Sequence, residues 1–247
     1  MISRKNVVTI YVVTKMIRIK RVNIGICGKG RIGAKVYAKL TELGLQPDYY
    51  RIDPLLGLTN QSEKLPGVID LLVISISPAK SQKKWQWNEI FSGLNQQIKN
   101  GELTIKRIIY VSSTRVYDGI ESGLVSASSR TIAGSEKAHE LCHAEQALQA
   151  MCECVSVIRC CGLIGNGYEK YQSILATAED RPRFAVDIED VTRLIISKAT
   201  DNNARSSITL LTDGKVHYKK QAYLFDEDKA FIETLAKEHK ILVNSEA

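Results

Sequence analysis

Long hydrophobic runs, a rich aromatic content and paired metal-binding cysteines are missing from this sequence of 247 residues. No apolar run approaches the roughly 20 residues of a membrane-spanning helix, and we therefore expect no membrane partner. Aromatic residues make up 6% of the chain and no nucleic-acid-binding motif accompanies them, so we expect no nucleic acid partner. No Cys-x-x-Cys pair occurs, and no metal site is predicted.

Acidic residues are missing from the first 41 positions, which hold ten Lys or Arg, and the whole chain has a net charge of +7. Such a segment is either a solvated basic edge or a positive field that attracts an anionic cofactor or nucleic acid. Because no nucleic-acid motif is present, we favour a basic edge that also contributes to binding an anionic cofactor.

A glycine motif, Gly28-Lys29-Gly30-Arg31-Ile32-Gly33, lies between an apolar run and a helical pattern. In a strand–turn–helix context, Gly28 allows the tight turn, Gly30 lets a pyrophosphate approach the backbone, and Gly33 lets the helix pack on the strand. The N–H groups at the start of the helix attract phosphate. The motif, with Arg31 and Ile32, predicts a dinucleotide site; the alternative is a tight turn without a ligand.

Asp53 bears on the choice between NAD and NADP. It lies 20 residues after Gly33, where an acid often binds the adenosine ribose of NAD. The alternative is a turn residue before Pro54. Arg31 and Arg51 favour NADP instead, since a guanidinium binds phosphate well. We expect NAD or NADP, with NAD slightly favoured.

Apolar strand patterns alternate with helical patterns from residue 22 onward. The run at 68–78 suits a parallel strand covered on both faces, and its end would bring Ser75 and Ser77 to the cofactor. Helical patterns cover 85–99, 136–151 and the tail at 221–240. These features predict an α/β fold, a Rossmann-type doubly wound parallel sheet with a small C-terminal substrate lobe.

The same pattern predicts how the chain is divided. Residues 1–21 are expected to form an appendage, and residues 22–247 a single NAD(P)-binding domain with a reduced substrate lobe at about 162–185 and 212–247. Six cysteines without a recognisable signal peptide predict free thiols and a cytoplasmic location.

Three further motifs follow in order: Val111-Ser112-Ser113-Thr114-Arg115-Val116-Tyr117, the turn from Arg159 to Gly167, and Val186 to Val191. With the glycine motif, they resemble the extended short-chain dehydrogenase/reductase family, the NAD-dependent epimerase/dehydratase group, in its atypical shorter members. The resemblance covers about residues 22–215. It implies that Ser113 orients the substrate, and that a homodimer forms through the helices at 85–99 and 136–151.

The Tyr-x-x-x-Lys pair of that family is missing. Aligned on Ala144-Glu145, its two positions fall near Lys137 and Leu141. Lys137 and His139 are therefore the candidate catalytic replacements, because lysine and histidine side chains transfer protons. The alternative is a solvated polar helix face.

Two functions remain open from the sequence. The first is an oxidoreductase or epimerase that uses NAD(P) on a small polar or sugar-like substrate, with a non-standard proton donor. The second is a non-catalytic dinucleotide-binding sensor or partner subunit. A structural domain without any ligand would leave the glycine motif without a purpose.

Overall fold

The computed structural model describes residues 22–60, 65–76, 80–81, 84–85, 87–167, 169–177 and 179–247. The predicted appendage at 1–21 and Ser77 lie outside the described residues.

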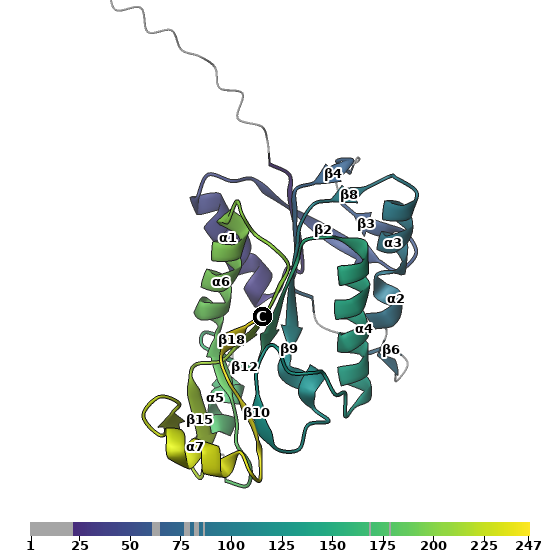
Figure 1. Ribbon diagram of the computed structural model, residues 1–247. Helices are drawn as coiled ribbons and strands as arrows, with labels where there is room; N and C mark the ends of the chain where they lie inside the picture. The colour runs from purple at the N-terminus through teal and green to yellow at the C-terminus, as the bar shows by residue number, and fades with distance from the viewer. Residues whose placement is uncertain are drawn as a thin grey trace, which may run out of the picture.

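A central sheet of eight strands organises the molecule (Figure 1). In order across the sheet, the strands are β18 (Ser245–Glu246), β14 (Ser207–Leu211), β11 (Val155–Cys160), β9 (Ile108–Ser113), β5 (Leu71–Ile74), β1 (Ile24–Cys27), β2 (Pro47–Asp53) and β3 (Gly57–Thr59). All neighbours from β14 to β2 are parallel, whereas the edge strands β18 and β3 are antiparallel. The predicted parallel sheet is therefore confirmed, with an antiparallel strand at each edge.

Helices cover both faces of this sheet (Figure 1). On one face lie α1 (Arg31–Glu42) and α6 (Ile188–Thr200), and on the other α2 (Trp87–Ile90), α3 (Ser92–Lys99) and α4 (Glu136–Met151). Every residue of β5 and of β11 is buried, as expected for parallel strands between two helical layers. None of these helices, nor any other in the described ranges, is long and apolar enough to cross a membrane.

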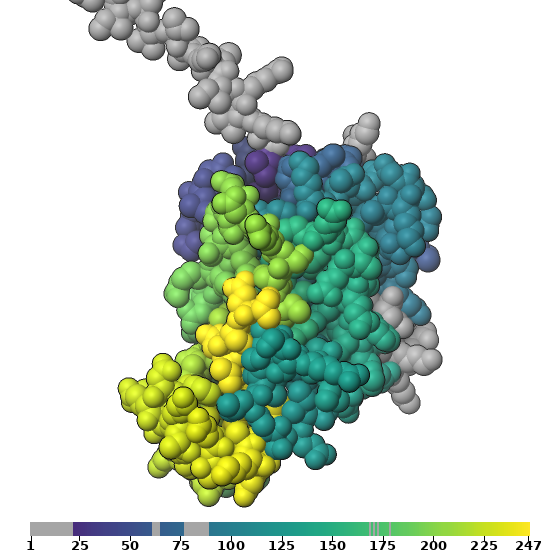
Figure 2. Space-filling view, viewed as in Figure 1, coloured from purple at the N-terminus to yellow at the C-terminus, as the bar shows by residue number. Residues whose placement is uncertain are grey.

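A C-terminal lobe projects from one end of the sheet (Figures 1 and 2). Its elements are β10 (Gly123–Val125), β12 (Gly162–Ile164), α5 (Glu169–Ala176), β13 (Ala185–Asp187), β15 (Lys215–Tyr218), β16 (Gln221–Leu224), α7 (Lys229–Leu235) and β17 (Lys240–Leu242). A separate core cluster that includes Tyr117, Phe184, Val216 and Ile232 holds the lobe together. Because Tyr117 follows β9 directly, this core ties the lobe to the central sheet.

The remaining elements are the short strands β4 (Val68–Ile69), β6 (Lys80–Ser81), β7 (Lys84–Trp85) and β8 (Thr104–Ile105), and the 3-10 helix η1 (Thr114–Tyr117).

The predicted helix at 221–240 is wrong over most of its length. Residues 221–224 form β16, which pairs with β15 in a hairpin, and only α7 is helical in this tail. Lys219 and Lys220, at the tip of the hairpin, both have positive φ angles. Two-residue hairpin loops of this kind favour Gly, Asn or Asp. Because two lysines stand here instead, the turn could not be recognised from the sequence.

Candidate functional site

Gly28 and Gly33 let α1 begin directly against the end of β1. Gly28 has a φ angle of +114°, and an added Cβ would lie 2.8 Å from Ser75 Oγ. A Cβ on Gly33 would lie 1.8 Å from the carbonyl oxygen of Gly28. No side chain fits at either position, so both glycines are required by packing, as the sequence predicted.

Gly30 is glycine for a different reason. A Cβ added there would meet no heavy atom within 4 Å, so the protein leaves the space beside this backbone open. Gly30 is the N-cap of α1, no side chain caps the helix, and its first turn has no acidic residue. The helix start thus presents N–H groups and a positive dipole end to an open space, which suits a phosphate-type anion.

Ser75 lies against the segment from Gly28 to Gly33, which we call the glycine loop. Its backbone N–H and its hydroxyl both donate to the carbonyl oxygen of Cys27, at 2.8 and 3.3 Å. Together with Arg31 and Ile32, it lines one of the two cavities that flank the loop. The structure therefore brings Ser75 to the glycine loop, as predicted.

The first of these cavities, which we call the β2 cavity, has a volume of about 960 Å³. Gly28 and Lys29 form one side, and Tyr49 and Arg51 of β2 form another, with Ile76 also in its lining. The Tyr49 ring stacks on Tyr37 at 4.6 Å, and the Lys29 ammonium lies 5.1 Å from the centre of the Tyr49 ring. The cavity thus combines aromatic surface with two cationic side chains.

Asp53 does not line the β2 cavity. Its Oδ1 accepts hydrogen bonds from the backbone N–H groups of Leu55 and Leu56, at 2.9 and 3.0 Å. The bonds from Leu56 and Leu55 lower the pKa of the Asp53 carboxyl. The turn interpretation of Asp53 is therefore observed, and the charged residues of β2 that line the cavity are Asp48 and Arg51.

The second cavity, the Ser113 cavity, has a volume of about 390 Å³ and lies on the other side of the glycine loop. Gly30, Arg31 and Ile32 line one side of it. Ser113, at the end of β9, and Lys137, on α4, line the cavity too. The structure therefore brings two of the three predicted catalytic residues together.

Lys137 and Leu141, near which the sequence comparison predicts the two positions of the Tyr-x-x-x-Lys pair, both line the Ser113 cavity. Burial lowers the pKa of Lys137, the Arg115 guanidinium lowers it further, and Asp118 opposes these effects. A lysine with a lowered pKa is better suited to proton transfer at neutral pH. His139, two residues along α4, is exposed and is not part of the cavity lining.

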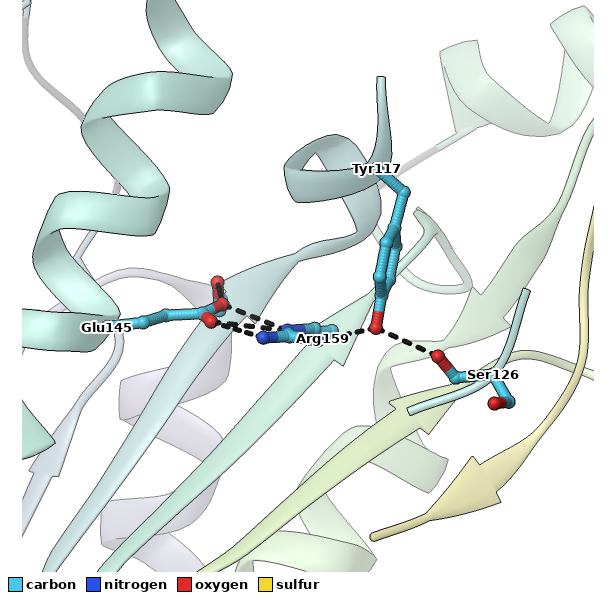
Figure 3. Close-up of polar contacts among 5 residues, drawn as sticks. Tyr117, Ser126, Glu145 and Arg159 are labelled. Atoms are coloured by element: carbon cyan, nitrogen blue, oxygen red, sulfur yellow. Dashed lines mark hydrogen bonds and ion pairs between the residues drawn. The ribbon is translucent and has the colours of Figure 1, made fainter. Parts of the chain in front are cut away.

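A buried ion pair fixes the elements behind Ser113 (Figure 3). Arg159 Nη2 of β11 donates to Glu145 Oε2 of α4 at 2.6 Å, and both side chains are 5% exposed. Arg159 Nη1 donates to the Tyr117 hydroxyl at 2.5 Å. The Tyr117 hydroxyl in turn donates to the Ser126 carbonyl at 3.0 Å. Ser112 Oγ donates to Glu145 Oε1 at 2.5 Å. The network joins α4, β9 and β11, so it fixes the helix that carries Lys137 against the strand that ends at Ser113.

Sequence reasoning missed Tyr171 as a site residue. Its ring lies so close to Gly162 that a Cβ there would be 1.8 Å from Tyr171 Cε1. Its hydroxyl donates to the Phe184 carbonyl at 3.1 Å, and the residue lines the Ser113 cavity. The signal in the sequence was Gly162, in the turn from Arg159 to Gly167, because a glycine there leaves room for a neighbouring side chain.

The described part of the chain contains no group of three or more His, Cys, Asp or Glu that would hold a metal ion. All six cysteines are free. Burial raises the pKa of the Cys161 thiol beside the Ser113 cavity, so this cysteine is not an activated nucleophile.

No family model matches the sequence, and no curated protein matches it either. Solved structures do match. UDP-N-acetylglucosamine 4-epimerase from Bacillus cereus is 17% identical, with 90% of this chain and 89% of that chain covered and a TM-score of 0.61. A dTDP-4-dehydrorhamnose reductase from Clostridium acetobutylicum is 13% identical, with 91% and 84% covered and a TM-score of 0.59.

A third similar structure is MoeE5 in complex with UDP-glucuronic acid and NAD, 16% identical over 90% of this chain and 86% of that chain, with a TM-score of 0.58. At such low sequence identities, the similarity to these structures establishes the fold alone. The chain has the Rossmann-type fold of the NAD-dependent epimerase/dehydratase class. The resemblance noted in the sequence is confirmed at the level of that fold.

Proposed function

We propose that the chain is an NAD(P)-dependent oxidoreductase or epimerase of the epimerase/dehydratase type, acting on a small polar or sugar-like substrate. One observation carries this proposal. The β2 cavity and the Ser113 cavity flank the glycine loop and both include Ile76. An extended dinucleotide would lie with its adenosine in the β2 cavity, its pyrophosphate at Gly30 and its nicotinamide near Ser113.

The bound nicotinamide would supply hydride acceptance or donation. The chain's own residues would orient the substrate and move a proton. Ser113 would hydrogen-bond the reacting oxygen of the substrate from the end of β9. Lys137 would exchange a proton with that oxygen, since it occupies the position of the missing tyrosine and its pKa is lowered. His139 has the weaker claim because it is exposed.

For the cofactor, we propose NADP rather than NAD. Arg51 and Lys29 line the β2 cavity, whereas Asp53 does not, and the two cations outnumber the single carboxylate in its lining, that of Asp48. A guanidinium and an ammonium favour an additional phosphate on the adenosine ribose. This reverses the preference that the position of Asp53 in the sequence suggested.

A non-catalytic dinucleotide-binding protein is the second candidate. The absence of a Tyr-x-x-x-Lys pair from the helix at 136–151 favours it, because that pair is the usual proton donor of the class. The enzyme requires that a ligand bound at Ser113 exchange a proton with Lys137, whereas the non-catalytic protein does not. A net or transient change in the oxidation state of the bound cofactor when a substrate is added, lost in Lys137→Met, would support the enzyme.

Calorimetric titration with NAD, NADH, NADP and NADPH tests the shared claim. The protein is expected to bind NADPH most tightly. Gly30→Ala should weaken binding by about tenfold or more, because its methyl group enters the space of the pyrophosphate, while the melting temperature stays the same. Gly67→Ala is the matched control, since a Cβ there also meets nothing within 4 Å. No binding at millimolar concentration would overturn the proposal.

A further inference from the structure

A third cavity, the lobe cavity, lies beside the Ser113 cavity and has a volume of about 500 Å³. Its charged lining residues are Arg115, Arg181, Arg183, Lys240, Asp118 and Glu121. Four cations against two carboxylates leave an excess of two positive charges, with His239 counted as neutral. A cavity with that excess favours an anionic ligand.

The fold holds the backbone that carries these cations in place. The backbone N–H of Arg183 donates to the His217 carbonyl at 2.8 Å, and the His217 N–H donates back to the Arg183 carbonyl at 3.0 Å. Arg181 and Arg183 flank Pro182, which restricts the backbone between them. Lys240 Nζ donates to the Tyr117 carbonyl at 2.7 Å. The cluster is thus built from segments far apart in the sequence.

The cavity is positive where Lys240 lies. Burial lowers the pKa of Lys240, Arg115 and Arg181 lower it further, and Asp118 raises it. Asp118 itself pairs with Arg115, at 3.3 Å from Nη1 to Oδ2. That pair accounts for one of the four cations, so Arg181, Arg183 and Lys240 remain to meet a ligand.

The lobe cavity continues into the Ser113 cavity, because Ser113, Cys161 and Tyr171 line both. A ligand group held by the arginines would therefore belong to the molecule whose reacting atoms lie at Ser113 and Lys137. The three aromatic side chains that line the lobe cavity are engaged within the protein. Phe184 is 7% exposed, the Tyr171 hydroxyl donates to the Phe184 carbonyl, and the His239 ring lies 5.7 Å from the Tyr218 ring between centroids.

We propose that the substrate is a small dianionic acid, a phosphate monoester or a dicarboxylate, whose charged groups are bound by Arg181, Arg183 and Lys240 in the lobe cavity. This inference rests on the proposed function, since it names the substrate class of the same site. Arginine forks match both oxyanions in geometry, and two positive charges in excess match a dianion. A nucleotide would lack a stacking surface in this cavity.

The test is calorimetric titration of the full chain saturated with NADPH, using inorganic phosphate, malonate, acetate and uridine diphosphate as probes. Phosphate or malonate should bind most tightly. The double variant Arg181→Gln/Arg183→Gln should bind that dianion about tenfold more weakly, and the control Arg193→Gln/Arg205→Gln should bind it as the parent does. Arg181→Gln alone, at an exposed side chain, should retain the fold and lose part of the affinity.

Three results would contradict the proposed substrate class. Equal affinity in the two double variants, acetate binding as tight as malonate, or tighter arginine-dependent binding of uridine diphosphate would each overturn the inference. NADPH binding without any dianion binding would overturn this inference alone. Failure of NAD, NADH, NADP and NADPH alike to bind would overturn the proposed function instead.

Discussion

The two sides of the candidate site are built by different means. On the glycine-loop side, the space for a ligand is made by backbone: Gly28 and Gly33 permit close packing, and Gly30 leaves a gap at the start of α1. On the Ser113 side, the space is made by side chains from α4, α5 and the lobe. The first side depends on short sequence spacing, and the second on contacts between distant segments.

The two sides therefore differ in how far their residues can change. A backbone cradle tolerates few substitutions, since a Cβ on Gly33 would meet the Gly28 carbonyl at 1.8 Å. A side-chain cavity can exchange its members if the framework behind it is fixed. Here the buried pair of Glu145 and Arg159 is that framework, and under the proposed function Lys137 takes the proton-transfer role.

The largest expected effect comes from breaking this framework. Glu145→Gln leaves the Arg159 charge buried without its carboxylate, and we expect it to lower the free energy of unfolding by about 3–5 kcal/mol. Denaturant unfolding measures this. The exposed pair of Lys39 and Glu42 supplies the control, since Glu42→Gln should change little. Equal midpoints for the two variants would contradict the role of the network.

Gly33→Ala is expected to disturb the backbone side next most strongly. The added methyl group cannot fit against the Gly28 carbonyl, so we expect a loss of about 1–3 kcal/mol in the free energy of unfolding, with loss of dinucleotide binding. Gly30→Ala should lose binding without losing stability. If thermal unfolding shows both variants to be equally stable, the distinction between the two glycines is wrong.

Gly162→Ala should separate the two sides. Its Cβ would displace the Tyr171 ring, which lies between the lobe and Ser113 cavities. Dinucleotide affinity, measured by calorimetry, should stay unchanged, while dianion affinity should fall by about tenfold. A parallel loss of both affinities would mean that the two sides are not independent.

Arg51→Ala sharpens the cofactor assignment. NADPH affinity should fall by about tenfold, equivalent to about 1.4 kcal/mol, because the ribose phosphate loses its guanidinium. NADH affinity should change far less, and competition titrations measure the ratio. An unchanged ratio would return the preference to NAD.

The smallest effect concerns pH. Because burial holds the folded-state pKa of Lys137 below its ordinary value of 10.5, the unfolded chain binds more protons than the folded chain between these two pKa values. The contribution of Lys137 to stability is therefore unfavourable at neutral pH, and this penalty is relieved as the pH rises toward 10.5. The stability difference between Lys137→Met and the parent should shrink over that range in denaturant titrations; a constant difference would contradict the lowered pKa.

The sequence predicted the elements that depend on local spacing. The glycine loop, the helix at 136–151 and the buried strand within 68–78 follow from motif and periodicity, and the structure confirms these elements. Ser113 was singled out by the resemblance of the motif that contains it, and its contact with a substrate stays a prediction.

The rest depends on tertiary contacts that spacing does not encode. The tail at 221–224 became a strand because it pairs with 215–218, despite a helix-like pattern. Tyr171 and the lobe arginines belong to the site only because the lobe folds back onto β9. Asp53 has the spacing of a ribose-binding acid, but the backbone at Leu55 and Leu56 takes its Oδ1.

A crystal structure of the chain with NADPH tests the central claim most directly. The account predicts the adenosine ribose phosphate beside Arg51 in the β2 cavity, the pyrophosphate over Gly30, and the nicotinamide ring between Ser113 and Lys137. A dinucleotide bound away from Gly30, or with its nicotinamide ring outside the Ser113 cavity, would contradict it.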